Sequence, residues 1–259
     1  MAAYKAQHVY DAIPSSPDHK DFRVGYVDTS LLNPTIMLPQ VPILNQANQG
    51  ACGGHGGAGA RETLEAIANA ALGNAPLVTL SRAFIYWRAR FYEQTQDQDS
   101  GVQIRDVVKV LQTDGVCTEQ EFPYNPNDFR SVPSDFDYTA AAQYKILTYT
   151  RLNSSDEVWS ELNNLHPVIL GIAVHKSFET QVGKDGIVPV PTPDDPLLGY
   201  HCVYSNGRTI DPQNTNNGGK FRVPNSWGEG FGDAGNAWLT DAYLNNPNLT
   251  TDAWSIAIG

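Results

Sequence analysis

The chain has 259 residues, of which 41% are hydrophobic and 10% aromatic, enough for one large domain or two lobes around a cleft. A formal net charge of −11 argues against nucleic acids and anionic membranes as partners. Three cysteines are too few for a disulfide framework and suit a reducing compartment, which favours a cytoplasmic location, although a single Cys117–Cys202 pair stays open.

The first 41 residues are rich in proline, aspartate and tyrosine and show little periodicity. They predict an irregular strap over the surface. The chain does not open on an apolar run, and no segment approaches the length of a transmembrane helix. We therefore expect neither a signal peptide nor a membrane span.

An extended approach from Pro42 ends in Gly50, and the thiol of Cys52 follows. A helix beginning at Cys52 is predicted because apolar residues recur there with helical spacing: Leu64, Ile67, Ala68, Ala71 and Leu72. A cysteine at a helix N-terminus meets unpaired backbone N–H groups and the positive end of the helix dipole. Both favour the thiolate, which is the nucleophilic form, so Cys52 is the candidate reactive residue.

Five glycines fill the first turns of this helix: Gly53, Gly54, Gly56, Gly57 and Gly59. Each costs about 1 kcal/mol relative to alanine in a helix interior. We expect them to permit close packing of a buried helix, with a wider cleft as the alternative. His55 lies three residues after Cys52. We interpret it as a packed or solvent-facing histidine rather than a second base.

Two more helices are expected before residue 140. An aromatic stripe over residues 81–92 predicts the first. Ser100 or Asp99 should cap the second, which Gly115 ends and whose apolar face is Ile104, Val107, Val108 and Leu111.

From about residue 140 the pattern changes to strands, expected over residues 144–150, 167–174, 198–204, 220–224 and 235–240. A short helix is expected at about 155–165. Helices first and an antiparallel sheet second indicate an α+β chain of two lobes.

Three stretches carry residues typical of a catalytic site. The segment Pro42–Cys52 reads Pro-Ile-Leu-Asn-Gln-x-x-x-Gly-Ala-Cys, with Gln46 six residues before the thiol. His201 lies on a predicted strand, two residues after a glycine. Asn225 opens the sequence Asn-Ser-Trp-Gly-Glu-Gly-Phe-Gly-Asp-Ala-Gly. Together they resemble the papain-like cysteine peptidases, in which glutamine, cysteine, histidine and asparagine occur in this order.

The match to that family has two departures and one alternative register. Gln49 replaces the first cysteine of the signature C-G-[SA]-C-[WY], and Gly53 replaces its aromatic residue. Only 51 residues precede Cys52, too few for the family's long helical propeptide, so the chain resembles bacterial-type members without one. If Cys52 were instead the family's first cysteine, His55 would stand at the nucleophile position and the protein would be inactive.

The resemblance implies a role for each residue of the site. Cys52 would attack the substrate carbonyl, and Gln46 with the Cys52 backbone N–H would hold the oxyanion. His201 would transfer the proton, Asn225 would orient the imidazole, and Trp227 would shield that bond from water. No metal or other cofactor is required.

The resemblance also suggests three residues that contact substrate: Gly101, Trp227 and Cys202. The backbone of Gly101 would pair with the substrate peptide, and a plain capping turn is the alternative reading. Cys202, next to His201, would help to wall the cleft, while its thiol should point to the opposite face of the strand and stay inert.

The implied fold is α+β, with an α-helical lobe and an antiparallel β-barrel-like lobe around a cleft. Residues 1–41 would be a strap across the lobes, residues 42–139 the helical lobe and residues 140–259 the β lobe. The expected activity is that of a cysteine endopeptidase acting on peptide or protein substrates through a thioester acyl-enzyme. A degenerate binding or structural module is one alternative class, and an acyltransferase or transpeptidase is another.

Overall fold

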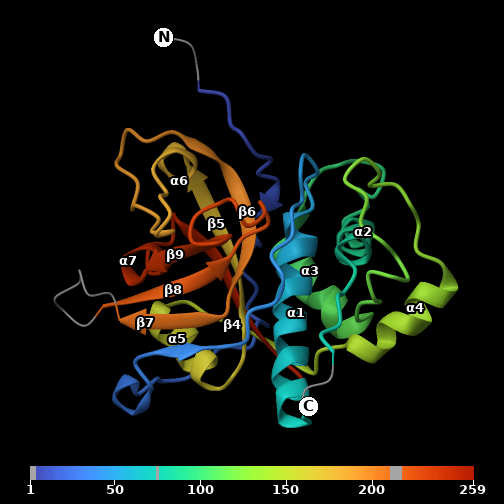
Figure 1. Cartoon of the computed structure of the whole chain (residues 1–259), viewed down its shortest axis with the longest axis horizontal. Coiled ribbons are helices and arrows are strands. Elements are labelled where there is room, and N and C mark those ends of the chain that lie inside the picture. The colour runs from blue at the N-terminus through green and yellow to red at the C-terminus, as the bar shows by residue number, and fades with distance from the viewer. Residues whose placement is uncertain (1–3, 74–75, 211–217) are drawn as a thin grey trace.

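The structure, a computed structural model, describes residues 4–73, 76–210 and 218–259. Helix α1 (Cys52–Ala71) runs between two groups of elements (Figure 1). On one side lie the helices α2 (Arg82–Tyr92), α3 (Ile104–Thr113) and α4 (Asp135–Ala141). On the other side lie two sheets with the short helices α5 (Ser155–Asn163), α6 (Lys176–Thr180) and α7 (Asp241–Leu244).

Each of these sheets has four antiparallel strands. The first has the order β4 (Thr148–Arg151), β10 (Thr250–Ala257), β5 (Val168–His175) and β6 (Leu197–Ser205). The second has the order β2 (Ile36–Met37), β7 (Gly207–Ile210), β8 (Gly219–Pro224) and β9 (Asn236–Thr240). A separate parallel pair joins β1 (Ala12–Ile13) to β3 (Val102–Gln103). Two 3₁₀ turns, η1 (Thr29–Leu31) and η2 (Ala142–Tyr144), complete the elements.

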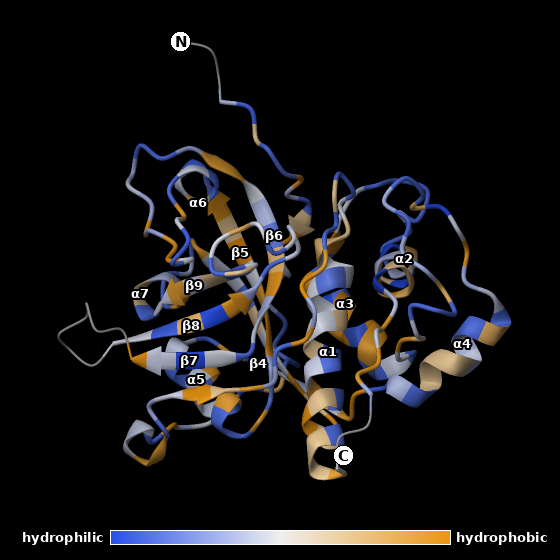
Figure 2. Ribbon diagram, viewed as in Figure 1, coloured by the Kyte–Doolittle hydropathy of each residue, from blue (hydrophilic) through white to orange (hydrophobic). Residues whose placement is uncertain are grey.

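The α+β two-lobe prediction is confirmed. The β lobe is not a closed barrel in the described part of the chain, because both of its four-stranded sheets stay open. The buried apolar strand β5 lies between β10 and β6, and Figure 2 shows hydrophobic colour along it. One core cluster joins α1, α2 and α3, and a second fills the space between the sheets.

Side-chain caps begin four of the helices, α2, α4, α5 and α7. Ser81 caps α2 by accepting a hydrogen bond from the Phe84 N–H at 3.0 Å. The predicted capping of α3 by Ser100 or Asp99 is wrong, since Gln103 occupies the N-cap. The Asp99 carboxylate instead accepts bonds from the Gly50 N–H (3.0 Å) and the Tyr86 hydroxyl (2.5 Å). These bonds tie the loop before α3 to the start of α1.

The glycines of α1 are explained by close packing on three sides. A Cβ at Gly54 would come within 2.3 Å of the Arg82 carbonyl oxygen on α2, and one at Gly57 within 2.6 Å of Val107 on α3. A Cβ at Gly59 would meet the Tyr204 ring of β6 at 2.5 Å. Such distances leave no room for side chains, so we attribute these glycines to helix packing.

All three cysteines are buried and free, so the Cys117–Cys202 pair that the sequence left open is not formed. Within the described ranges, no helix is both long enough and apolar enough to cross a membrane.

Candidate active site

Cys52 is the first residue of α1 and is buried. Backbone groups of Cys202, Gly53 and Asp11 hydrogen-bond its sulfur and favour the thiolate, but burial is the larger effect. Burial, with the nearby Asp11 carboxylate, raises the pKa of the Cys52 thiol to about 11. The ionised sulfur expected from the helix N-terminus is therefore not the state of this structure, because the sulfur is buried.

His201 lies on β6, one residue before Cys202, whose backbone hydrogen-bonds this sulfur. Its Nε2 is 2.8 Å from the Asn225 Oδ1, which can only accept, so Nε2 carries the hydrogen and Nδ1 keeps its lone pair. Nδ1 is buried and has no hydrogen-bond partner among the described residues. Burial lowers the pKa of His201 to about 4, against the opposing effect of the Asn225 bond. Both the thiol and the imidazole are thus neutral here.

Asn225 and Trp227 hold the imidazole from two sides. Asn225 follows β8, where its backbone N–H donates to the Gly235 carbonyl oxygen at 3.0 Å and its Oδ1 also accepts from the Ser226 N–H at 2.8 Å. The Trp227 ring stacks on the His201 ring, with centroids 5.1 Å apart and planes 28° apart. These contacts fix both the tilt and the tautomer of the ring.

Gln46, six residues before Cys52, links the two lobes. Its side-chain Oε1 accepts from the Ser226 hydroxyl at 2.5 Å, and its Nε2 donates to the Gln49 carbonyl oxygen at 3.0 Å. Its backbone N–H donates to the Ser226 carbonyl oxygen at 2.9 Å. An amide NH₂ has two hydrogens, so one Nε2 hydrogen is left after the Gln49 bond.

His55 has a different surrounding from Cys52. Its Nδ1 is 3.0 Å from the Ala51 carbonyl oxygen, and its ring packs edge-on against Tyr124 at 4.8 Å. Burial, with Arg82 as a smaller contribution, lowers the pKa of His55 to about 3. The sulfur of Cys52, by contrast, faces the backbone of Cys202, next to His201. The Cys202 thiol packs against α1, 3.0 Å from where a Cβ at Gly56 would lie. Any contact of this residue with a substrate in the cleft therefore comes from its backbone.

Residues 8–13, here called the cleft segment, lie across these groups. Asp11 pairs with Tyr200 on β6 and bonds the Cys52 sulfur through its backbone. The Asp11 carbonyl oxygen lies where a Cβ at Gly101 would be, 1.5 Å away, and Gly101 has φ +69°. Beyond it, Ala12 and Ile13 form the parallel pair with Val102 and Gln103. A peptide backbone therefore packs against Gly101 where a side chain would otherwise lie, although that backbone belongs to the same chain.

The other end of the cleft segment covers His201 and Trp227. The Tyr10 ring lies 6.0 Å from the His201 ring and 5.8 Å from the Trp227 ring, both edge-on. The His8 ring stacks on Trp227, with centroids 4.0 Å apart and planes 8° apart. The segment thus runs from Trp227 past Cys52 to Gly101.

A carboxylate on α6 holds this end in place. Glu179 accepts bonds from the hydroxyls of Tyr10 and Tyr4 (2.7 Å for Tyr4) and from the backbone N–H groups of Gln7 (2.9 Å) and His8 (3.1 Å). Its side chain has no exposed surface. We call this group of contacts the Glu179 anchor.

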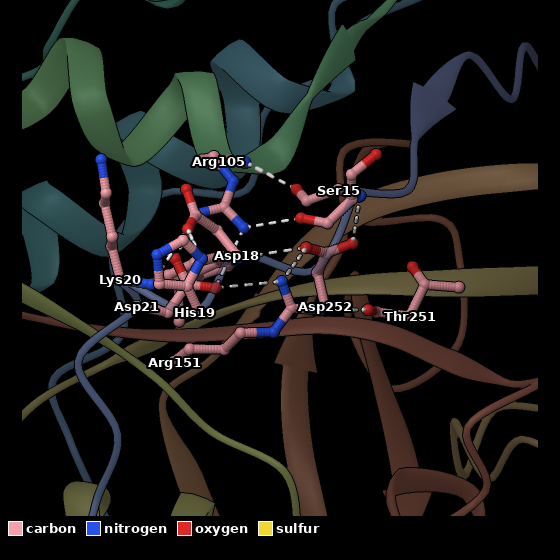
Figure 3. Close-up of polar contacts among 11 residues, drawn as sticks. Ser15, Asp18, His19, Lys20, Asp21, Arg105, Arg151, Thr251 and Asp252 are labelled. Carbon is pink, nitrogen blue, oxygen red and sulfur yellow. Dashed lines mark hydrogen bonds and ion pairs between the residues drawn. The ribbon is translucent and has the colours of Figure 1, made fainter.

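A second group of contacts, the Arg105 anchor, holds residues 15–21 and is drawn in Figure 3. Arg105 of α3 pairs with Asp21 and donates to the Ser16 carbonyl oxygen at 2.7 Å. Asp252 of β10 accepts from the Ser15 N–H at 3.0 Å. Arg151 of β4 lies 3.8 Å from the Asp21 carboxylate and 3.9 Å from that of Asp252. The anchor therefore joins the strap to α3 and to two strands of the β lobe.

Sequence reasoning missed the cleft segment and Glu179. β1 is two residues long, too short for an alternating pattern, and Glu179 is 169 residues from Tyr10. Only the unusual density of tyrosine and histidine in residues 4–10 could have drawn attention to this stretch.

Comparisons with known proteins show the family of the chain. A model of the papain family of cysteine proteases matches residues 38–256. An uncharacterised peptidase C1-like protein of Acanthamoeba polyphaga mimivirus is 32% identical over 186 residues, 68% of this chain. The aligned part is 58% of the viral protein, so the chain spans less than two thirds of that relative.

Solved structures give the same result for the fold. Xylellain, a cysteine protease from Xylella fastidiosa, is 29% identical with a TM-score of 0.85, over 100% of both chains. A digestive procathepsin L 3 from the larval midgut of Tenebrio molitor is 20% identical with a TM-score of 0.70, over 92% of this chain and 75% of that one. The latter likeness concerns the fold alone.

Proposed function

Because the chain belongs to the papain family of cysteine proteases, we propose that it is a cysteine endopeptidase acting through a thioester acyl-enzyme. One observation carries the proposal. A buried thiol at a helix N-terminus occurs together with an imidazole that an amide orients. A thiol and an oriented imidazole are the parts that nucleophilic acyl transfer needs.

The proposed reaction begins when the Cys52 proton passes to Nδ1 of His201, the nitrogen with the free lone pair. The sulfur attacks the substrate carbonyl carbon, and the negative charge on the oxygen is met by the Cys52 backbone N–H and the remaining Nε2 hydrogen of Gln46. His201 then gives its proton to the leaving amine as the C–N bond breaks. Water, deprotonated by His201, hydrolyses the thioester and returns the thiol.

Asn225 and Trp227 act through the imidazole in this proposal. The bond from Nε2 to Asn225 keeps the lone pair on Nδ1, where the thiol proton must arrive. The stacked Trp227 ring excludes water from that bond. Both are positioning residues.

The cleft segment must leave before a substrate can enter, since it covers Cys52, His201 and Gly101. Its direction explains how it can persist uncleaved. The leaving amine has to lie beside His201, so a substrate would run from Gly101 toward Trp227. The segment runs the opposite way, with His8 at Trp227 and Ala12 beside Val102. A reversed chain does not offer Cys52 a carbonyl whose amine lies at His201.

The test is labelling with a thiol-reactive peptidyl epoxide, mapped by mass spectrometry. We expect slow labelling of the full chain and rapid labelling of Cys52 in the full-length His8→Ala/Tyr10→Ala variant. Adding His201→Ala to that variant should abolish the rapid reaction.

Two results would contradict the proposal. Failure of the opened variant to label at any pH from 5 to 8 would favour a degenerate binding module. Labelling together with transfer of the acyl group to an added amine, in preference to water, would favour an acyltransferase.

A further inference from the structure

Glu179 lies at the end of the cleft where a leaving strand would emerge. It follows Phe178, whose ring packs 5.5 Å from the Trp227 ring, and Trp227 in turn stacks on His201. Tyr10 reaches Glu179 with its hydroxyl while its ring lies against both His201 and Trp227. A side chain about as long as tyrosine, starting beside His201, therefore reaches this carboxylate.

Residues 4–10, which include the start of the cleft segment and the residues just before it, supply every donor that the Glu179 carboxylate has in the Glu179 anchor. Two hydroxyls and two backbone N–H groups point at its two oxygens, and the His8 Nδ1 lies 3.4 Å from Oε1. Burial alone would raise the pKa of Glu179, but these hydrogen bonds outweigh burial and hold the pKa below its usual range. The site is thus built for an anion that is surrounded by donors.

When the segment leaves, these donors leave together. A carboxylate in a partly closed site then lacks partners, which is costly unless a new donor arrives. A lysine or arginine side chain of the substrate would supply both donors and the opposite charge. A glutamate or aspartate would instead meet like charge.

Resting on the proposed peptidase activity, we propose that Glu179 selects peptides carrying lysine or arginine at one of the first two residues after the scissile bond. The same carboxylate would hold the cleft segment and bind a side chain of the substrate beyond the scissile bond. The segment and the substrate therefore compete for one acceptor. Glu179 is a specificity residue in this proposal and takes no part in the chemical step.

Other charged groups around α6 strengthen or weaken the attraction of Glu179 for a positively charged substrate side chain. The Lys176 ammonium, one turn before Glu179 and 5.0 Å from the Tyr4 ring, is the internal cation that could neutralise the emptied site. The Asp195 carboxylate, from a later loop, accepts the Ser177 N–H at 3.3 Å and adds negative charge at the N-terminal end of this helix. Glu229 lies two residues after Trp227 but is exposed, so water screens its charge.

The experiment compares matched peptides in the full-length His8→Ala/Tyr10→Ala variant. The peptides differ only at the first or second residue after the scissile bond, which is arginine, glutamine or glutamate. We expect kcat/KM for the arginine peptide to exceed that for the glutamine peptide by about tenfold, with the glutamate peptide poorest. The ratio should shrink at high salt, because the interaction is between charges.

Adding Glu179→Gln to the same variant should bring the arginine-to-glutamine ratio close to one, and Glu179→Lys should favour the glutamate peptide. Glu229→Gln is the matched control and should leave the ratio unchanged. Each ratio is measured within one protein, so differences in folding or in release of the segment cancel.

Failure of this inference is distinct from failure of the proposed function. If none of the peptides is cleaved, the peptidase proposal falls. Two other outcomes leave the peptidase proposal intact but contradict selection by Glu179. In the first, all peptides are cleaved and the arginine-to-glutamine ratio is one with and without Glu179. In the second, a high ratio persists in Glu179→Gln.

Discussion

The two anchors of the N-terminal strap differ in chemistry and in what they hold. The Glu179 anchor uses one carboxylate as acceptor for four donors of residues 4–10. The Arg105 anchor spreads two guanidinium groups and two carboxylates over α3, β4, β10 and residues 15–21. The first lies beside the candidate catalytic residues, and the second joins the lobes away from them.

The difference indicates that opening the cleft and unfolding the protein are separable. Release of residues 4–10 breaks the bonds to one buried acceptor and the ring contacts of His8 and Tyr10, and it leaves no pair of buried charges divided. The Arg105 anchor, in contrast, includes the buried Asp252 and the nearly buried Asp21, so breaking it leaves charges without partners inside the fold.

The largest effect is expected at the Arg105 anchor and concerns stability. Arg105→Met removes the closer partner of Asp21, whose side chain is 4% exposed, and leaves only the Arg151 contact at 3.8 Å. It should lower the free energy of unfolding by about 3 kcal/mol. Urea denaturation measures this change. Lys109→Met is the control, because the Lys109–Asp106 pair is 3.9 Å long with Lys109 49% exposed and should shift stability by less than about 0.5 kcal/mol. Equal effects of the two variants would remove the distinction between the anchors.

The next effect concerns activity and lies at the Glu179 end. The His8→Ala/Tyr10→Ala variant loses the stacked and edge-on rings on Trp227 and the Tyr10 bond to Glu179. Peptide hydrolysis by the full chain should rise by about a hundredfold, because a thiol of pKa about 11 is almost wholly protonated at neutral pH. Hydrolysis that stays at the level of the unmodified chain would show that the segment is not what restrains it.

A smaller change sharpens the comparison within the Glu179 anchor. Tyr10→Phe removes one hydroxyl bond to a buried carboxylate and should speed hydrolysis by about tenfold, the equivalent of about 1.4 kcal/mol. Tyr4→Phe removes a bond at the more exposed outer end and should have a weaker effect. A larger rate increase in Tyr4→Phe than in Tyr10→Phe would show that residues 4–7 contribute most to the binding of the segment.

The smallest effect expected at neutral conditions is that of pH. The pKa of Glu179 is held below its ordinary value of 4.5, so the bonds to its carboxylate contribute fully above 4.5 and are lost as pH falls through the lowered pKa. The amide NMR signals of Gln7 and His8 should shift to those of an unbound segment only in this acid range. In Glu179→Gln the transition should disappear, and a transition that persists in that variant would contradict its assignment to Glu179.

Much of the candidate site was predictable from sequence because its residues lie in local motifs. Gln46 and Cys52 lie in one stretch, Asn225 and Trp227 lie in another, and the helix from Cys52 has regular apolar spacing. Strand β10 was not predicted, since buried polar residues such as Asp252 and Ser255 interrupt its apolar pattern. Their partners come from the strap and from other strands, which local patterns do not reveal.

The electrostatic state of the site was not predictable for the same reason. The position of Cys52 at a helix N-terminus predicted a thiolate, and the local contribution has that sign. Burial of the sulfur, with a smaller contribution from the carboxylate of Asp11, a residue 41 positions earlier in the chain, reverses the outcome. Contacts between residues so far apart depend on the complete fold.

The most direct test of the account is the pKa of the Cys52 thiol in two full-length proteins, the unmodified chain and the His8→Ala/Tyr10→Ala variant. It is obtained from the pH dependence of alkylation at Cys52, mapped by mass spectrometry. We predict a value near 11 in the unmodified chain and one below the ordinary thiol value of about 8.5 in the variant. The same value in both proteins, or a low value in the unmodified chain, would contradict the claim that the cleft segment holds the sulfur in its neutral form.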